Sequence, residues 1–596
     1  MNLIQKIGIG LLMTAIGVFI LSLGFSNYTL TAENLSVKSE FHKSEILAEA
    51  KNAGILGKTF TSNVSFISAF KDVLNKSQSS LNKKATAGLP DGVGEWDYKI
   101  GDWEIKGYIF ENVKSSAGGL LPNNVPLFFF LTFGFGIIGG LLYVLPMFNL
   151  LPGIKNNNIY HNSLTRGLQL NVRTFFLLST IACSLLYGIV YMGYSLFFPI
   201  LSLVAMGLTY YLVNKGGEKE NAPTRSASPD ITGWFGVIAG IFLILFYILL
   251  YWAPHYITNW IALVDPLSRF LSGNAASQWF LYGFLYTIIV IVMGIRMIAK
   301  YRHNRYQMIR TTSVMFFQTA FAFLIPEMMV RLNQPWYDFK NIWPLNYTFF
   351  FDWNINQLIS SGNFGIFMLV WGIVLALIGV PLFTYFFGKR WYCSWVCGCG
   401  GLAETMGDPY RQLSDKSVKA WKYERYIIHG VLLFAVLMTI GVLYSYFTGN
   451  KQLLFLNTDT VRQWYGFLIG SAFAGVVGTG FYPLMGNRTW CRFGCPLAGY
   501  LGLVQRFKSR FRITTNGGQC ISCGNCSTYC EMGIDVRAYA QKGQNIVRAS
   551  CVGCGICAAV CPRGVLKLEN GSADISERTT ELKGIHIQNG KVRLVG

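Results

Sequence analysis

Charged residues are scarce in this chain: of its 596 residues only 13% are Asp, Glu, Lys or Arg, whereas 52% are hydrophobic. Acidic residues are the scarcer sign, with 29 Asp and Glu against 50 Lys and Arg and a formal net charge of +21. Histidine is rarer still, with 6 residues. So little charge beside so much apolar surface excludes an ordinary soluble globular protein.

Cysteine is nearly absent from the first 390 residues, which hold only Cys183 of the 14 cysteines in the chain. Cys183 stands in an apolar stretch, where a small packing residue is expected. The remaining cysteines recur at short intervals that suit metal ligands and not a disulfide framework. We therefore expect the cysteine-rich part to face a reducing compartment, the cytoplasm.

Long apolar runs are the most abundant feature that is present. Lys and Arg gather in the connections that ten membrane spans would place on one side of a bilayer, and the positive-inside rule makes that side the cytoplasm. The membrane thus accounts for the basic charge, and we expect lipid and no nucleic acid as a partner. The predicted spans lie near residues 7–24, 126–148, 174–193, 194–213, 232–252, 278–298, 311–330, 363–387, 426–447 and 462–484.

Residues 26–125 are polar and mixed, and the ten-span arrangement places them outside the cytoplasm as a small domain. The periodicity near Lys38–Ala53 is typical of a helix, whereas Trp96–Phe110 predicts a strand. No small-x-small cleavage site follows the first apolar run, so we expect residues 1–25 to be an uncleaved anchor rather than a signal peptide.

Eight cysteines near the C-terminal end follow the spacing of a bacterial-type ferredoxin with two [4Fe–4S] clusters. Each Cys-x2-Cys-x2-Cys run supplies three thiolates to one cluster, and the fourth cysteine of each run ligates the other cluster. Glu531 follows Cys530 where proline is usual, so we expect a shifted potential and not a lost cluster. The predicted ligands are Cys520, Cys523, Cys526 and Cys561 for cluster one and Cys551, Cys554, Cys557 and Cys530 for cluster two.

Two shorter segments repeat each other directly after two predicted spans. Gly388–Cys397 and Gly486–Cys495 each contain a glycine, an arginine two residues later, an aromatic residue and then Cys-x3-Cys. At helical spacing the two sulfur atoms of a pair share one face, and Arg390 and Arg488 would offset their charge. The paired cysteines are Cys393, Cys397, Cys491 and Cys495.

Three interpretations of these pairs stay open. Four thiolates could hold a third iron–sulfur cluster or another soft metal at the cytoplasmic membrane surface. The pairs could instead form a redox-active dithiol or a copper site, or they could be packing cysteines at helix starts. Cys399 adds a fifth thiol with no counterpart in the repeat.

The two Cys-x3-Cys pairs after membrane spans, followed by the two ferredoxin runs, resemble the membrane polyferredoxins. This family includes three types: the nitrous-oxide-reductase regulators, the quinol-oxidising ferredoxins of periplasmic nitrate reductase and the cytochrome-oxidase-assembly ferredoxins. The resemblance covers roughly residues 360–565 and selects no subfamily. One departure is Gly398, which stands where proline would follow the first pair.

The resemblance implies electron exchange between the quinone pool or cytoplasmic donors and a periplasmic metalloenzyme system. The nitrous-oxide type also implies an external domain with covalently attached FMN. Residues 26–125 lack the attachment motif, because Ser115–Gly119 has no acceptor threonine at its end. No FMN is therefore expected.

We predict an integral-membrane iron–sulfur electron-transfer protein, a component of an oxidoreductase system in the bacterial inner membrane. It would pass electrons between cytoplasmic [4Fe–4S] clusters and a quinone pool or a periplasmic redox protein. The alternative is a metal-centre assembly factor or cupric reductase that supports a copper-containing respiratory enzyme; a redox sensor is a third candidate. Copper handling usually draws on Met or His, and residues 26–125 contain one histidine and no methionine, which favours electron transfer.

The predicted fold is mostly α: a polytopic helical membrane protein with a C-terminal α+β ferredoxin domain and a small extracytoplasmic domain. Glu327 lies inside an apolar run and is a candidate proton acceptor for a quinone, although we favour an ion pair with Arg331 one turn later. The predicted domains are a membrane anchor at 1–25, an extracytoplasmic domain at 26–125, a transmembrane bundle at 126–360, a polyferredoxin-type core at 361–512, a ferredoxin domain at 513–565 and a tail at 566–596.

Overall fold

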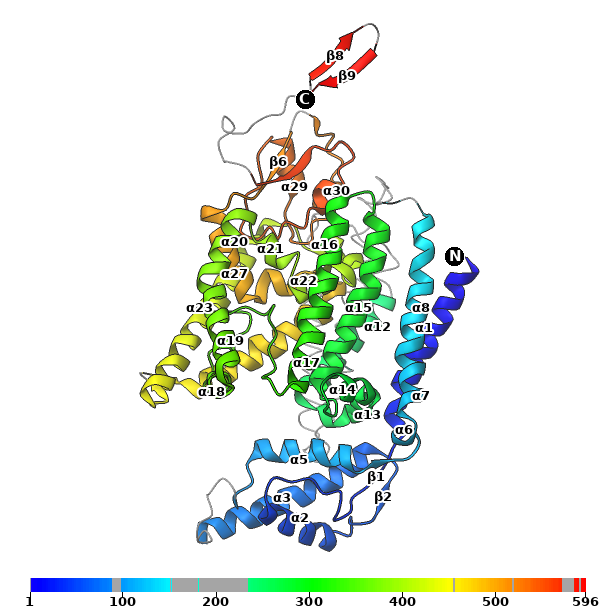
Figure 1. The fold of residues 1–596 in the computed structure, drawn as a ribbon, viewed down its shortest axis with the longest axis vertical. Helices are drawn as coiled ribbons and strands as arrows, with labels where there is room; N and C mark the ends of the chain where they lie inside the picture. The colour runs from blue at the N-terminus through cyan, green and yellow to red at the C-terminus, as the bar shows by residue number, and fades with distance from the viewer. Residues whose placement is uncertain are drawn as a thin grey trace.

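Three parts follow one another along the longest axis of the molecule. A small helical domain lies at one end, a bundle of long helices forms the middle, and the cysteine-rich C-terminal segment lies at the opposite end (Figure 1). The structure is a computed structural model that describes residues 2–87, 98–150, 152, 181, 234–453, 456–516, 519–570, 584–588 and 591–595.

The small domain packs around a core of its own. Its antiparallel sheet has the strand order β2-β1-β3, with Tyr28 opposite Phe60 on one side and Ala117 on the other. The Tyr28 hydroxyl also bonds Asn259 of the bundle at 3.0 Å, which fixes the domain to the bundle. Its elements are β1 Asn27–Thr29, α2 Glu40–Asn52, β2 Thr59–Phe60, α3 Asn63–Ala87, α5 Asp102–Ser115 and β3 Ala117–Gly118.

The strand predicted over Trp96–Phe110 is wrong, because the described part of this stretch enters helix α5. The Glu104 carboxylate accepts the Gly101 N–H at 3.0 Å and closes the first turn of α5. Ile105 and Ile109 then share the buried face of the helix. The helix predicted near Lys38–Ala53 is confirmed as α2.

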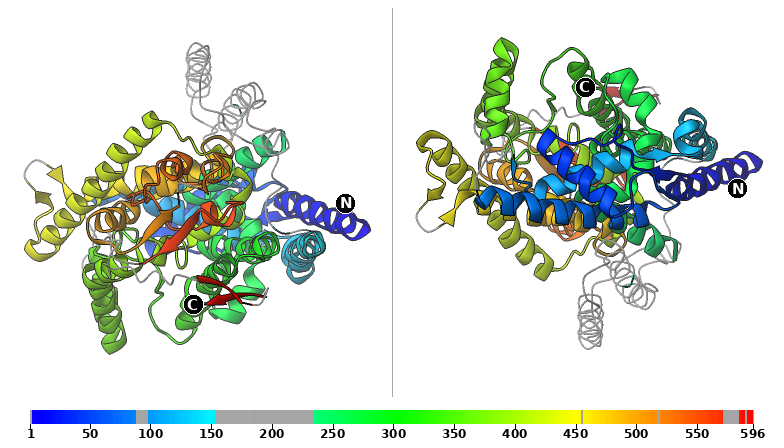
Figure 2. Two further views of the ribbon diagram at one scale, coloured as in Figure 1. Left: turned by 90° about the horizontal axis from the view of Figure 1, so that it is seen from above. Right: turned by 90° about the horizontal axis from the view of Figure 1, so that it is seen from below.

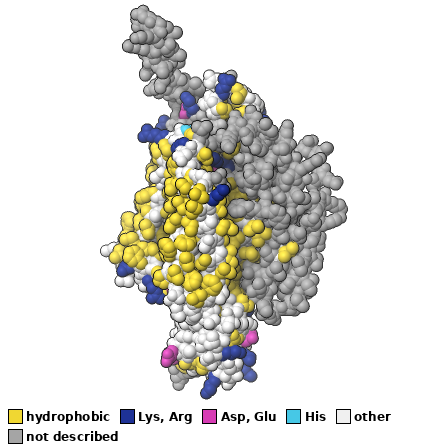
Figure 3. Space-filling model, turned by 90° about the vertical axis from the view of Figure 1, so that its right-hand side faces the viewer, with side chains coloured by type: hydrophobic (Ala, Val, Ile, Leu, Met, Phe, Trp, Pro, Cys, Tyr) yellow, Lys and Arg dark blue, Asp and Glu magenta, His cyan; other side chains and the backbone are white. Residues whose placement is uncertain are grey.

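Six helical spans among the described residues are long and apolar enough to cross a membrane, and one bent helix pair would make a seventh. On the face shown in Figure 3, hydrophobic side chains cover most of the middle of the described part, and most of the charged side chains lie above and below them. The six spans are Leu3–Gly24, Val125–Asn149, Gln278–Tyr301, Arg305–Arg331, Gly362–Phe387 and Val418–Thr448, and the bent pair is Ile238–Trp252 with Pro254–Leu263.

The number of ten spans stays a prediction. The spans predicted at 174–193 and 194–213 lie outside the described residues. The span predicted at 462–484 is divided between four helical segments and is not among the six. These segments are α24 Thr458–Tyr465, η9 Gly466–Val477, α25 Gly478–Gly480 and α26 Tyr482–Met485.

The first helix packs closely on α8 at the edge of the bundle (Figure 2). A Cβ atom at Gly8 would lie 2.7 Å from the Gly139 carbonyl oxygen, and one at Gly139 would lie 2.7 Å from the Gly8 oxygen. Glycine at both positions therefore lets the two backbones touch, as small residues do in membrane helix pairs.

Several spans contain wide π-helical turns, a feature that is frequent at functional sites. Such turns are η2 Phe130–Gly134, η6 Phe317–Leu324, η7 Leu375–Gly379 and η9. The α-helices of the bundle are α1 Leu3–Leu21, α7 Val125–Phe129, α8 Phe135–Val144, α12 Trp234–Trp252, α13 Thr258–Leu263, α14 Asp265–Leu271, α15 Gln278–Tyr301, α16 Arg305–Phe316, α17 Ile325–Arg331, α18 Asp352–Ser360, α19 Gly362–Val374, α20 Val380–Phe387 and α23 Val418–Thr448.

The C-terminal segment is built on a two-stranded antiparallel sheet. Strand β6 pairs with β7, with Arg512 opposite Glu569, so the two ends of the ferredoxin-like segment meet. A separate hairpin, β8 with β9, follows. The elements are β6 Arg512–Thr515, α28 Asn525–Thr528, α29 Val536–Gln541, α30 Ile556–Ala559, β7 Leu566–Glu569, β8 Gly584–Gln588 and β9 Lys591–Val595.

Candidate metal centres

The eight ferredoxin cysteines fall into two groups around two equivalent short helices. Cys526 lies in α28 and Cys557 lies in α30. One small cavity is lined by all four cysteines that were assigned to cluster one. Around the other helix, Cys554, Cys530 and Cys551 are the first neighbours whose charges act on Cys557, and Cys526 of the first group follows them. This is the grouping that crossed ligation requires, and the two ligand sets themselves stay predictions.

The chemistry of these groups fits a thiolate-bound metal. Burial raises the pKa of the Cys526 thiol to about 12 and raises that of Cys557 well above its usual value. A thiolate in such a place needs a positive charge beside it, which a coordinated metal supplies. In the described part of the chain, no three His, Cys, Asp or Glu side chains converge as they would around a single metal ion.

The repeated Cys-x3-Cys segments adopt the same local structure. Gly388 and Gly486 have φ values of 68° and 88°, in the region that favours glycine, and each redirects the chain out of the preceding helix. One short helix then carries the first cysteine of the pair, and the second cysteine caps the next helix. These helices are α21 Arg390–Cys393 and α22 Gly398–Thr405 in the first repeat, and η10 Trp490–Gly494 and α27 Pro496–Lys508 in the second.

The expectation that each pair shares one helical face is wrong. Cys397 and Cys495 are N-cap residues of new helices, so each pair spans a break between two helices. The Cys495 sulfur accepts the Ala498 N–H at 3.4 Å, and the Gly400 N–H bonds Cys397 in the same way. The N-terminus of a helix favours a thiolate, because its amide groups point toward the sulfur.

The fold brings all five cysteines of the two repeats together. Cys399, which sequence reasoning could not place, bonds Cys397, and this bond outweighs burial and holds the pKa of Cys397 at about 6. Burial raises the pKa of Cys393 to about 12, with Cys397 and Cys491 among its charged neighbours. Burial likewise raises the pKa of Cys495, whose neighbours are the other three paired cysteines.

The two arginines of the repeats play different roles. Arg488 donates to the Cys491 sulfur at 3.6 Å, as predicted. Arg390 does not face the thiols: it lies over the ring of Phe511, 4.7 Å from its centroid. The buried side chain of Lys389 takes the place expected for Arg390, since its charge lowers the pKa of Cys393.

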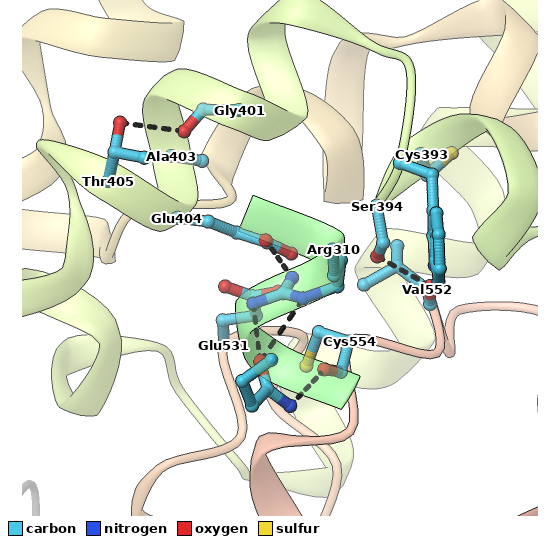
Figure 4. A network of polar contacts seen from close by, with 12 residues as sticks. Arg310, Cys393, Ser394, Gly401, Ala403, Glu404, Thr405, Glu531, Val552 and Cys554 are labelled. Carbon is cyan, nitrogen blue, oxygen red and sulfur yellow. Dashed lines mark hydrogen bonds and ion pairs between the residues drawn. The ribbon is translucent and has the colours of Figure 1, made fainter. Parts of the chain in front are cut away.

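A buried ion network lies between the cysteine pairs and the ferredoxin-like segment (Figure 4). Its centre is Glu531, whose carboxylate bonds Arg411 at 2.7 Å and Arg488 at 3.0 Å. Glu404 binds Arg310 and Arg488. Burial alone would raise the pKa of Glu531, but the surrounding guanidinium groups outweigh it and hold the pKa at about 2.

The network continues away from the cysteines. Asp408 accepts Arg411 at 3.3 Å, Lys300 at 2.6 Å and Arg296 at 3.5 Å. Five cations thus surround three carboxylates, Asp408, Glu404 and Glu531. Sequence analysis recognised Glu531 as unusual but did not identify the ion pairs that it makes. The signal that could have found them is the presence of charged residues inside segments that are otherwise apolar or rich in glycine.

Hydrogen bonds fasten the loop of cluster two to the helices below it. Tyr306 donates to the Gly553 carbonyl at 2.9 Å, and Gln307 donates to that of Cys554 at 2.8 Å. Ser394 donates to the Val552 carbonyl at 2.8 Å, and Gln505 donates to that of Cys551 at 2.8 Å. These bonds hold the cysteines assigned to cluster two close to the five-cysteine site. The four bonds named here do not involve the cysteines assigned to cluster one.

Two cavities reach Cys491. One, of about 520 Å³, also touches Ala549 and Ser550 beside cluster two and is lined by four cations, Lys389, Arg425, Arg506 and Arg548. The other, of about 230 Å³, extends among the bundle helices and is lined by tyrosines.

Glu327 does not pair with Arg331, contrary to the favoured interpretation. Its carboxylate accepts the Trp336 indole N–H at 3.1 Å. Arg331 instead donates to the backbone carbonyls of Arg269 and Phe270. Glu327 therefore ties the end of α17 to the loop that follows it, and Arg331 ties it to the C-terminal end of α14.

Comparisons with known proteins match the cysteine-bearing part of the chain. A 4Fe-4S dicluster domain matches residues 519–566, and a 4Fe-4S binding domain matches twice, at residues 369–417 and 466–514. The second model thus covers both Cys-x3-Cys repeats. No solved structure matches the chain.

Two curated proteins are similar in sequence to part of this chain. The chain is 28% identical over 166 residues to "Putative electron transport protein YccM" of Escherichia coli (strain K12), which covers 25% of this chain and 43% of the relative. It is 28% identical over 187 residues to the methylamine utilization ferredoxin-type protein MauN of Paracoccus denitrificans, which covers 29% and 60%. The chain spans about half the length of these curated relatives. The cysteine-bearing part of the chain is similar to 4Fe-4S ferredoxin-type electron-transport proteins, and these matches select no subfamily.

Replacing Glu531 with glutamine should loosen the ferredoxin-like segment. The change removes one of the two carboxylates that each of the buried guanidinium groups of Arg411 and Arg488 contacts, and breaking a buried pair costs about 3–5 kcal/mol. The measurement is the thermal midpoint of the purified protein, with protease sensitivity of residues 509–511 as a second readout. The control is Asp352→Asn, which breaks an exposed pair with Arg462 and should cost at most about 1 kcal/mol. Equal effects of the two changes would contradict the role of Glu531.

Proposed function

We propose that this chain passes electrons between cytoplasmic [4Fe–4S] clusters and a quinone pool or a periplasmic redox enzyme system, through the membrane in which it lies. The matched domains and the names of its relatives support an iron–sulfur electron-transport protein. The membrane location, the cytoplasmic side and the acceptor are the parts that we propose.

The observation that carries the proposal is the position of the cysteines assigned to cluster two. Six backbone carbonyls of the segment Arg548–Cys554 accept hydrogen bonds from side chains of the bundle and its connections. The five-cysteine site lies directly below this segment. Redox groups bound at these two sites would lie one after the other, and electrons could pass between them from the C-terminal segment toward the helices.

We assign a third cluster to the five-cysteine site, with Cys393, Cys397, Cys491 and Cys495 as its holders, because no three ligand side chains of the described residues converge as they would around a single metal ion. The family match to a 4Fe-4S binding domain at both repeats supports a cluster there over copper. A cluster at this place would supply one-electron transfer. The chain's own contribution is to place the thiols at helix starts, to surround them with cations and to keep water away through burial.

The arrangement of the two end domains supports the proposed orientation. The small N-terminal domain and the ferredoxin-like segment lie at opposite ends of the bundle (Figure 1). If the cysteine-rich end faces the cytoplasm, residues 26–125 lie outside it. The domain boundaries proposed from the sequence stay predictions.

Cys523→Ser should remove one of the two ferredoxin clusters. Because each cluster needs four thiolates, the variant should lose about four irons and one EPR signal after anaerobic reduction. The signal of cluster two should persist and serves as the internal control. Full iron content in this variant would refute the ligand assignment.

Changing Cys397 and Cys495 to serine together should interrupt the path at the five-cysteine site. We expect electron flow to a membrane acceptor to fall at least about tenfold while both ferredoxin clusters remain reducible, since their ligands are untouched. The measurement is stopped-flow reoxidation of the reduced protein in nanodiscs. Cys183→Ser is the control for loss of a cysteine. A normal rate in the double variant would make the paired cysteines structural.

A reporter fused after Gly596 should be active only as a cytoplasmic fusion. The prediction follows from the basic connections that the positive-inside rule assigns to the cytoplasm. Paired fusions to a reporter that is active only in the cytoplasm and to one that is active only in the periplasm give the measurement. A strong periplasmic signal would reverse the orientation.

A further inference from the structure

The tyrosine-lined cavity lies among bundle helices on one side of the five-cysteine site. Its volume is about 230 Å³, and it touches both Cys399 and Cys491. Helices α12, α15, α24 and α26 and the connection before α18 all contribute to its wall. Seven of the lining residues are tyrosines: Tyr247, Tyr251, Tyr282, Tyr286, Tyr347, Tyr465 and Tyr482.

The lining of this cavity is polar but uncharged. None of its residues is Asp, Glu, Lys, Arg or His. The cavity on the ferredoxin side is charged instead, with four cations and one carboxylate, Glu424, in its wall and Arg548 lying over the ring of Trp421 at 4.5 Å. An anionic ligand would gain nothing in the tyrosine cavity, because it would lose its hydration there without meeting a charge. A neutral ligand suits it.

Two buried polar atoms of the wall have no partner among the described residues. They are the Tyr465 hydroxyl and the Asn487 side-chain oxygen, and both residues are only 1% exposed. A buried polar group without a partner costs about 1–3 kcal/mol. A ligand that accepts a hydrogen bond from the Tyr465 hydroxyl and donates one to the Asn487 side-chain oxygen would satisfy both atoms.

Glycines of η9 keep the cavity open. A Cβ atom at Gly470 would lie 2.8 Å from the Tyr347 hydroxyl oxygen, and one at Gly475 would lie 2.7 Å from the ring of Tyr247. An apolar cavity of about 150 Å³ accommodates benzene. The 230 Å³ available here therefore suits one substituted ring and is small for a nucleotide cofactor.

We infer that this cavity binds the head group of a lipid-soluble quinone. Such a ring is neutral and planar, and it carries two oxygens that accept hydrogen bonds as the quinone and donate them as the quinol. Phenolic hydroxyls can serve either form. The inference rests on the proposed function, which it deepens by assigning the substrate class and the place where the ring lies beside Cys399 and Cys491.

The test is photolabelling of the full chain in nanodiscs of defined phospholipid, with an azido short-chain ubiquinone as the probe and peptide mass spectrometry as the readout. We expect labels on η9 or on the connection that carries Tyr347, displaced by unmodified short-chain ubiquinone. Gly470→Leu fills the cavity and should reduce labelling at least about tenfold.

Tyr465→Phe guards against a Gly470 variant that fails to fold. It keeps the ring and removes only the hydroxyl, so the apparent affinity should fall several-fold, up to about tenfold for one hydrogen bond. Tyr337→Phe is the matched control, since Tyr337 is a buried tyrosine in a separate hydrophobic cluster. The apparent affinity of the Tyr337→Phe variant for the quinone probe should equal that of the unaltered chain.

Labelling of residues around the cationic cavity, with loss in Arg506→Gln and none in Tyr465→Phe, would overturn the assignment. Absence of displaceable labelling, with water alone filling the cavity, would overturn it as well. Iron content and cluster reduction are measured on the same samples. Normal iron and reducible clusters without labelling would refute the quinone site and leave the proposed function standing, whereas displaceable labelling of η9 in a chain without iron would support the site and refute that function.

Discussion

The ion network centred on Glu531 is the interaction on which the arrangement of the redox sites depends. A single buried carboxylate or guanidinium group is costly, so each member of the network requires the others to be in place. The members come from three parts of the chain that are far apart in sequence: the bundle, the repeats and the ferredoxin-like segment. Because Glu531 adjoins Cys530 and Arg488 contacts Cys491, the same side chains that hold the segment down also set the spacing between the two cysteine sites.

Charge balance follows from this network. Nearest the cysteines, the guanidinium groups of Arg310, Arg411 and Arg488 meet the carboxylates of Glu404 and Glu531, so positive charge is in excess there. The helix starts at Cys397 and Cys495 add their amide dipoles to it. Thiolates are anions, and burial alone would keep the thiols protonated. The excess charge therefore makes the thiolate form, the one that binds metal, compatible with a buried site.

Features that depend on the spacing of nearby residues could be predicted from the sequence. Features that depend on contacts formed only in the folded chain could not. The grouping of the ferredoxin cysteines depends on residues a few positions apart, and the apolar spans depend on composition. The pairs Cys393/Cys397 and Cys491/Cys495 misled, because Gly388 and Gly486 and the helix breaks that follow them outweigh the i,i+4 spacing. Trp96–Phe110 alternates like a strand, but the capping contact of Glu104 selects a helix. Glu327 bonds Trp336 in the loop just after α17, and Arg331 bonds α14, some sixty residues earlier in the chain, so the i,i+4 spacing of the two residues did not decide their partners.

The two cavities at Cys491 divide the surroundings of one cysteine by charge. The cations of the larger cavity lie on the ferredoxin side, where water can screen them, and the uncharged tyrosines lie among the bundle helices, where an unpaired charge would be far more costly. Positive charge on one side stabilises the more negative, reduced state of any metal that the thiolates hold. Neutral hydroxyls on the other side leave that balance unchanged while they can still exchange hydrogen bonds. The cysteine site thus stands at the boundary between an electrostatic environment that favours electrons and one that admits only neutral molecules, which is the arrangement required where electron transfer meets the membrane interior.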